Sequence, residues 1–143
     1  MTNAKDDDRP LAGMRVIEVG QLLAGPFAGT ILGYYGAEVI KVERTTSGDI
    51  QRNVGSMRNG FSGFFPVLNR GKRSIALDLT TTEGRDIVRR LTRDADVVVQ
   101  NFRPGVVKRL GVDYEALSAD NPGLVYLSIS GFGQTGPRAG DRA

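Results

Sequence analysis

The segment QNFRPG, residues 100–105, combines an amide, an aromatic ring and a guanidinium directly after an apolar, strand-like run. Open α/β sheets bind ligands at the carboxyl ends of their strands, so this segment stands where a ligand would lie. Asn101 and Arg103 could donate hydrogen bonds to an anion, and Phe102 could pack against a flat ring. A simple turn with a packed phenylalanine explains the same residues without a ligand.

Further cations follow other predicted elements. Arg44 ends the strand-like run EVIKVER, where doubly wound folds commonly contact an adenosine ribose or its phosphate. Lys108 and Arg109 lie in a short predicted helix, where cations near the carboxyl end also favour the helix dipole without any ligand. The basic run RGKRS, residues 70–74, is not a P-loop, because arginine follows its lysine where serine or threonine is required. It is either an exposed start of a strand or a clamp for phosphates.

The glycines after the first predicted strand do not form a dinucleotide fingerprint. Gly20, Gly25 and Gly29 do not match the spacing G-x-G-x-x-G, so NAD binding by that motif is disfavoured. Small residues such as Gly29 and Gly33 would let a helix pack closely on a sheet. The turn at Gly25 and Pro26 could still present helix amides to an anionic group.

The composition excludes several kinds of chemistry. The chain has 143 residues, no cysteine and no histidine, so it offers no thiolate nucleophile, no imidazole base and none of the usual zinc ligands. The net charge is +3, and the excess of positive charge is scattered through residues 41–109 with no dense block, so it does not by itself select a nucleic-acid partner. No run is apolar and long enough for a membrane span. We therefore expect a cytoplasmic protein that uses no metal and binds neither nucleic acid nor membrane.

The elements that must position these residues alternate between strand and helix. Apolar runs predict five strands, with helical segments between them; the first helix is expected to start at Pro26 and to end before Gly36, and Thr80 with Glu83 predicts a capping box. The expected strands cover residues 14–20, 38–44, 72–79, 95–102 and 124–130. This order predicts a Rossmann-like, doubly wound parallel sheet with flanking helices. The long connection 45–71 is expected to be a functional or partner-covered loop.

The domain organisation predicted from the sequence is simple. Residues 1–10, with an acidic run before a proline, are expected to be a flexible leader. Residues 11–143 are expected to form one Rossmann-like unit, a length that suits a single domain or part of a larger one.

Several blocks of sequence, taken in order, resemble the family III CoA-transferases, the family of formyl-CoA transferase, carnitine CoA-transferase and α-methylacyl-CoA racemase. The blocks are PLAGMRVIEVGQLLAGPFAG, LGYYGAEVIKVER with its SGD, NRGKRSIALDL with TTEGRD, and ADVVVQNFRPGVVKRLGVDYEALSADNPGLVYLSISGFGQTGP. They cover nearly the whole chain. The resemblance implies the incomplete large domain of such an enzyme.

The resemblance implies a binding site for coenzyme A, or for an acyl-CoA as substrate. Its thiol end would run towards GQLLAGP and GFGQTGP, and Ser130 stands where some transferases of the family have a lysine. Coenzyme A carries several phosphates and a purine, which suits arginines beside an aromatic or apolar face. The implied binding residues are Arg44, Leu77, Thr80, Asn101, Phe102, Arg103 and Arg109.

The resemblance also implies where the nucleophile lies. In the transferases an aspartate in a Gly-Tyr-Asp step attacks the acyl-CoA thioester, and glycine amides stabilise the oxyanions. Asp141 follows a glycine directly and matches the Asp-Arg pair that precedes that step. We therefore expect the catalytic aspartate a few residues beyond Ala143 and no catalytic residue within the chain, which would then be inactive alone.

The resemblance implies partners and leaves alternatives. Family members form interlocked dimers, so we expect a homodimer in full-length form or a complementing carboxyl-terminal chain, acting on an acyl-CoA and a carboxylic acid. A racemase of the same family, with histidine before the aspartate, is the first alternative. The second is a non-catalytic module that binds CoA or assists assembly. The third is an unrelated Rossmann enzyme that uses NAD or S-adenosylmethionine.

Overall fold

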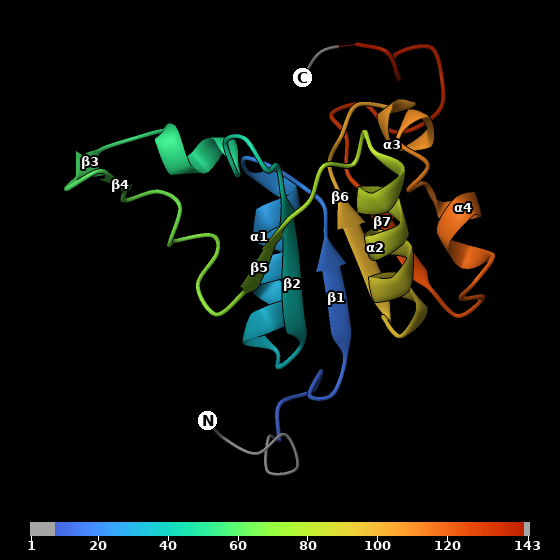
Figure 1. Cartoon of the computed structure of the whole chain (residues 1–143), viewed down its shortest axis with the longest axis horizontal. Coiled ribbons are helices and arrows are strands. Elements are labelled where there is room, and N and C mark those ends of the chain that lie inside the picture. The colour runs from blue at the N-terminus through green and yellow to red at the C-terminus, as the bar shows by residue number, and fades with distance from the viewer. Residues whose placement is uncertain (1–7, 142–143) are drawn as a thin grey trace.

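A five-stranded parallel sheet forms the centre of the molecule in the computed structural model, which describes residues 8–141 (Figure 1). The strand order is β5-β2-β1-β6-β7, and every neighbouring pair is parallel. In chain order of these five strands this is the Rossmann arrangement 3-2-1-4-5. The strands are β1 (Arg15–Glu18), β2 (Glu38–Glu43), β5 (Arg73–Ala76), β6 (Val97–Gln100) and β7 (Val125–Ser128). All five lie within the predicted ranges, so the predicted fold class is confirmed.

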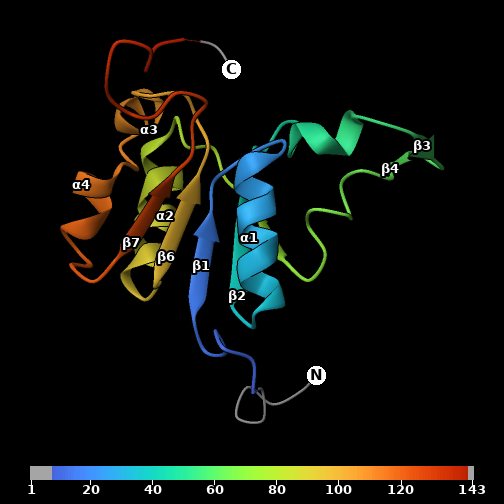
Figure 2. The same cartoon turned by 180° about the vertical axis from the view of Figure 1, so that it is seen from behind.

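Helices cover both faces of the sheet. Helix α1 (Ala24–Tyr34) lies on one face, against β1 and β2, and α2 (Thr82–Arg93) lies on the other, as the two opposite views show (Figures 1 and 2). The short helices α3 (Val106–Arg109) and α4 (Tyr114–Ser118) follow β6. Among residues 8–141, no helix combines the length and the apolar character needed to cross a lipid bilayer.

The core has two layers because side chains alternate along each strand. Ile17, Val42 and Val98 pack with Val88 of α2 on one face. Val16, Val39 and Val97 form a smaller cluster on the α1 face. Strand β6 is buried on both faces, as its run of three valines predicted.

Helix α1 begins earlier than predicted. Its first residue is Ala24 and its N-cap is Leu23, so Pro26 is the third helical residue and not the first. Proline is accepted there because the first turn of a helix has no intrahelical partner for its amide groups. Gly36 follows the C-cap with a φ of +109°, a conformation that favours glycine, which confirms the predicted end of the helix.

The connection between β2 and β5 contains structure that the sequence did not predict. It holds the 3-10 helix η1 (Ile50–Asn53) and a small antiparallel hairpin of β3 (Met57–Arg58) and β4 (Phe61–Ser62). Asn59 and Gly60 form the turn with φ angles of +51° and +79°. This segment projects sideways from the sheet, away from α2 (Figure 1).

The expected leader falls largely outside the described residues, which exclude residues 1–7. Within the described part, residues 8–10 are exposed, and Arg9 Nη1 donates a hydrogen bond of 3.3 Å to the Gly33 carbonyl of α1. The backbone is tied to the same helix by the Leu11 amide, which bonds to the Tyr35 carbonyl at 2.8 Å.

Candidate functional site

A cavity of about 570 Å³ opens at the carboxyl ends of the strands, between the loops that follow β1, β2, β5 and β6. Open α/β sheets bind ligands at this edge, and the volume is in the usual range for a small-molecule site. Its wall is mainly apolar with a few charged groups. The lining residues are Val19, Gln21, Val42, Glu43, Arg44, Thr45, Thr46, Leu77, Asp78, Leu79, Thr80, Phe102, Arg103, Val106 and Leu110.

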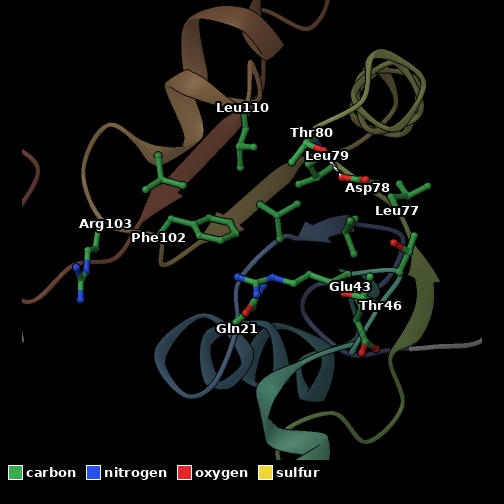
Figure 3. A pocket seen from close by; sticks show the side chains of 15 residues that line it. Gln21, Glu43, Thr46, Leu77, Asp78, Leu79, Thr80, Phe102, Arg103 and Leu110 are labelled. Atoms are coloured by element: carbon green, nitrogen blue, oxygen red, sulfur yellow. Dashed lines mark hydrogen bonds between the residues drawn. The ribbon is translucent and has the colours of Figure 1, made fainter.

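Five of the seven residues predicted to bind the ligand line this cavity. Arg44 comes from the end of β2, Leu77 and Thr80 from the loop after β5, and Phe102 and Arg103 from the loop after β6. Figure 3 shows the Phe102 ring pointing towards the middle of the lining side chains, while Arg103 lies at the margin and points away. The cavity therefore has an aromatic ring in its interior and one arginine, Arg103, at its margin.

Asn101 does not line the cavity but holds the loop that does. Its Oδ1 accepts a hydrogen bond from the Gln21 amide, and its Nδ2 donates to the Gln21 carbonyl, both at 2.8 Å. Gly20 and Gly25 make room for it, because a Cβ at either position would lie 2.7 and 2.8 Å from Asn101 Oδ1. Two of the glycines that miss the dinucleotide fingerprint thus serve close packing on a side chain.

Arg109 lies on α3 beside Val106 and Leu110 but is not among the residues that line the cavity. Its side chain is exposed. Within residues 8–141, Arg44, Arg103 and Arg109 have no salt bridge and no side-chain hydrogen bond to another described residue. Their guanidinium groups can therefore bind an anionic ligand without breaking an internal contact.

Thr80 takes part in a turn that differs from the predicted capping box. The N-cap of α2 is Thr81, whose hydroxyl accepts a hydrogen bond from the Gly84 amide at 3.1 Å, and not Thr80 with Glu83. Thr80 instead donates from both its hydroxyl and its amide to Asp78 Oδ1, at 2.7 and 2.9 Å (Figure 3). These bonds lower the pKa of the exposed Asp78 carboxyl, which keeps it an anion at the cavity wall.

A buried group of four charges lies beneath the loop between β1 and α1. Lys41 Nζ is 2.7 Å from Glu18 Oε1 and 2.7 Å from Asp49 Oδ2, and Lys72 Nζ is 2.6 Å from Glu18 Oε2. None of the four side chains is more than 3% exposed. Burial lowers the pKa of Lys72, and the Glu18 carboxylate opposes that effect. We call Glu18, Lys41, Asp49 and Lys72 the buried charge cluster.

Lys72 shows that both interpretations of the basic run 70–74 were wrong for this residue. Its ammonium does not meet solvent or a phosphate but bonds to Glu18, to the Pro26 carbonyl at 2.7 Å and to Asn69 Oδ1 at 3.3 Å. Arg73 is exposed and pairs with Glu38 instead. Lys72 therefore fixes α1 and the long connection to the sheet.

Glu43 extends these contacts to the cavity wall. It accepts hydrogen bonds from the Asp49 amide at 2.8 Å, from Arg52 Nε at 2.6 Å and from the Ser74 hydroxyl at 2.6 Å. Burial opposes ionisation of Glu43, but these hydrogen bonds outweigh it and lower its pKa to about 2. The carboxylate is therefore neutralised by Arg52 and does not repel an anion in the cavity.

The sequence carries a signal for the buried charge cluster. Glu18 and Lys41 each stand between two apolar residues, in strands that a parallel sheet buries on both faces. Buried charges must be paired, so such residues predict partners within the core. Only the fold reveals that Lys72 and Asp49 are among them.

The carboxyl-terminal loop after β7 brings no paired nucleophile into the cavity. Asp141 is exposed, and its Oδ2 is 2.9 Å from Arg138 Nε. Ser130 Oγ is buried and has no hydrogen-bond partner within residues 8–141. Residues 131–138 are all exposed.

Comparison with known proteins identifies relatives along nearly the whole chain. It is 51% identical over 130 residues to succinyl-CoA–D-citramalate CoA-transferase of Chloroflexus aurantiacus, covering 90% of this chain and 32% of the relative. It is 48% identical over 146 residues to succinate–glutarate CoA-transferase of Agrobacterium fabrum, covering 97% of this chain and 36% of that relative. The chain thus spans about a third of the length of these relatives.

A solved structure agrees with the sequence comparison. The crystal structure of a CAIB/BAIF family protein from Brucella suis superposes with a TM-score of 0.88 at 47% identity, over 95% of this chain and 37% of that one. The family model of the family III CoA-transferases matches residues 11–143. With the strand order and the edge cavity in agreement, the chain belongs to CoA-transferase family III.

Proposed function

We propose that this chain is the coenzyme A-binding portion of an acyl-CoA:carboxylate CoA-transferase. The observation that carries the proposal is the cavity at the carboxyl edge of the sheet, which gathers Arg44, Leu77, Thr80, Phe102 and Arg103 from three separate loops. The names of its relatives support the same reaction, since those enzymes are CoA-transferases.

The chemistry of the cavity wall fits the parts of coenzyme A. The purine would lie against Phe102 and the apolar side chains of Leu77 and Leu110, and the phosphates would meet the cavity-lining Arg44 and Arg103. Arg109, exposed on α3, would add a further contact to a phosphate that extends beyond the cavity. Glu43 is already bonded to Arg52, so it adds little repulsion.

The reaction itself is proposed for the longer protein. An aspartate outside this chain would attack the thioester carbonyl of the acyl-CoA and release the CoA thiolate, which leaves a mixed anhydride. The thiolate would then attack the aspartyl carbonyl, giving an aspartyl-CoA thioester and the free carboxylate product. The acceptor acid would reverse the two steps. The role of this chain is to hold the CoA while its thiol is free.

We propose that dicarboxylic acids are the substrates. The two relatives are named for succinyl-CoA or succinate and for D-citramalate or glutarate, and the acids succinate, citramalate and glutarate each have two carboxyl groups. The alternative of a racemase has no support from these names. Succinyl-CoA as donor and glutarate as acceptor are therefore the first pair to test with a full-length protein.

We also propose that further polypeptide covers the α1 face, either in a homodimer or as a complementing chain, in a cytoplasmic enzyme. Large apolar side chains are exposed there. Phe27 and Tyr34 of α1 are 55% and 61% exposed, and Val125 and Leu127 of β7 are 59% and 40% exposed. Apolar surface of this kind is typical of protein–protein contacts.

Calorimetric titration of the chain with coenzyme A tests the binding proposal. NAD is titrated in parallel, and light scattering reports the association state. We expect micromolar affinity for coenzyme A and no heat with NAD. A folded sample that binds NAD but not coenzyme A would contradict the proposal, and one that binds neither would show that the chain alone holds no cofactor.

A further inference from the structure

The loop between β1 and α1, residues 20–23, forms one wall of the cavity through Gln21. Its backbone is unusual, because Leu22 has a φ of +66°, a left-handed conformation that residues other than glycine seldom adopt. Such a conformation persists only where surrounding contacts hold it. The question is which side chains hold this loop.

Three side chains bond to successive peptide groups of the loop. Lys41 Nζ donates to the Gly20 carbonyl at 3.1 Å, and Asn101 bonds both peptide groups of Gln21. Asp49 Oδ1 accepts from the Leu22 amide at 3.1 Å. Asp49 is therefore the acceptor at the strained residue itself.

Asp49 is itself fixed on every side. It is 0% exposed, its Oδ2 is 2.7 Å from Lys41 Nζ, and its Oδ1 also accepts from the Gln51 amide at 2.9 Å. Its own amide donates to Glu43 Oε2 at 2.8 Å. Glu43, the last residue of the neighbouring strand β2, also lines the cavity, so Asp49 links two walls of the same cavity.

We propose that Asp49 is a positioning residue for the coenzyme A site, because it holds Leu22 in its left-handed conformation and thereby fixes the Gln21 wall against the wall formed by residues 43–46. The inference rests on the proposed function for the identity of the ligand. It does not rest on it for the geometry, which concerns only the loop. Asp49 acts through Leu22 and does not itself line the cavity.

The test must separate the hydrogen bond to Leu22 from the charge that Asp49 contributes. Replacing Asp49 alone would leave two ammonium groups, Lys41 and Lys72, beside the single carboxylate of Glu18. The Asp49 variants are therefore made in a Lys41→Met background, where the charges of Glu18 and Lys72 still cancel. In that background Asp49→Asn keeps an oxygen for the Leu22 amide, whereas Asp49→Ala removes it. The two double variants differ in this oxygen, which also accepts from the Gln51 amide. Asp49→Ser in the same background separates the two bonds, because its hydroxyl can still cap Gln51.

The first readout is coenzyme A affinity. We expect Asp49→Ala to bind about tenfold more weakly than Asp49→Asn, the effect of one lost hydrogen bond. The second readout, made without ligand, is hydrogen exchange at the Gln21 amide, which bonds to Asn101 and not to Asp49. Faster exchange there in Asp49→Ala shows that the whole loop has moved.

Val88→Ala is the matched control. Val88 is buried in the core layer between the sheet and α2, so its replacement by alanine lowers stability without touching the loop. It should leave the exchange at Gln21 unchanged relative to other amides. Should the alanine variant not fold, Asp49→Ser replaces it, since its shorter side chain can still cap Gln51 but does not reach the Leu22 amide.

Equal exchange at Gln21 and equal affinity in the folded Asn and Ala variants would overturn the inference. If the unaltered chain binds no coenzyme A, the proposed function fails, and the exchange comparison alone decides the role of Asp49. Faster exchange at Gln21 with unchanged affinity would also overturn it, since the loop would then not shape the site.

Discussion

Asn101 forms hydrogen bonds to both peptide groups of Gln21. Its Oδ1 accepts from the Gln21 amide and its Nδ2 donates to the Gln21 carbonyl, at 2.8 Å each. The two residues come from the loops after β6 and β1, which are neighbouring strands. These two hydrogen bonds span the point where the strand order reverses, which is the usual place for a ligand in a doubly wound sheet. They tie two walls of the cavity together.

Asn101→Ala should lower the free energy of unfolding by about 2 kcal/mol, because it leaves the Gln21 amide and carbonyl without their partner in a partly buried loop. Urea unfolding measures the change. Asn53→Ala is the control, since Asn53 is exposed, and it should change stability by less than about 0.5 kcal/mol. Equal stability of the two variants would show that the hydrogen bonds between Asn101 and Gln21 do not stabilise the fold.

Gly29→Ala should destabilise the protein by about 3 kcal/mol. A Cβ at this position would overlap Glu18 Oε2, an oxygen bonded to Lys72, so the methyl group must displace a buried ion pair. Thermal unfolding followed by circular dichroism measures the effect.

Gly33→Ala in the same helix is the matched comparison for Gly29. Its nearest neighbour would be Val39 Cγ2 at 3.4 Å, an ordinary contact, so it should be neutral or add up to about 1 kcal/mol through helix propensity. A similar loss at Gly29 and Gly33 would mean that the helix, and not the buried charge cluster, is what the methyl group disturbs.

Glu43 should make the protein sensitive to acid. Its pKa is about 2 in the folded state against an ordinary value of 4.5, so its ionised form stabilises the fold above pH 4.5. That contribution is lost as the pH falls from 4.5 towards 2. A shift of this size corresponds to about 3 kcal/mol, which solvent screening of the 42% exposed Arg52 reduces to about 2 kcal/mol.

Comparing the native chain with Glu43→Gln by urea unfolding between pH 2 and pH 7 checks this expectation. The native chain should be more stable by about 2 kcal/mol at pH 7, and the difference should shrink steadily below pH 4.5. A difference that stays constant down to pH 2 would show that the stabilising contacts of Glu43 do not depend on its charge.

The sheet could be predicted from the sequence because its signals are local. The three valines of β6 and the apolar runs of β1, β2 and β7 each mark a strand, and their alternation with helices gives the parallel order. The hairpin of β3 and β4 was missed although Asn59 and Gly60 are a typical turn pair, because strands of two residues have no readable alternation.

The candidate site could be predicted only in part. Residues such as Phe102 and Arg103 stand at strand ends and could be found by position, and the family resemblance added Leu77 and Thr80. The role of Lys72 could not be predicted, because its partner Glu18 is brought to it by the pairing of β1, β2 and β5. Long-range pairing of charges depends on the fold and leaves no pattern at short spacing.

Arg109→Ala tests the one arginine that the family resemblance assigns to coenzyme A and the cavity does not include. A charge-assisted hydrogen bond to a phosphate is worth roughly 1.5 to 3 kcal/mol, so calorimetry should find coenzyme A bound roughly 10 to 150 times more weakly. Lys108→Ala, the neighbouring exposed cation on α3, controls for the change in net charge and should have a much smaller effect. If both variants bind coenzyme A as tightly as the native chain, Arg109 is outside the site, and Arg44 and Arg103, which line the cavity, remain as the phosphate contacts.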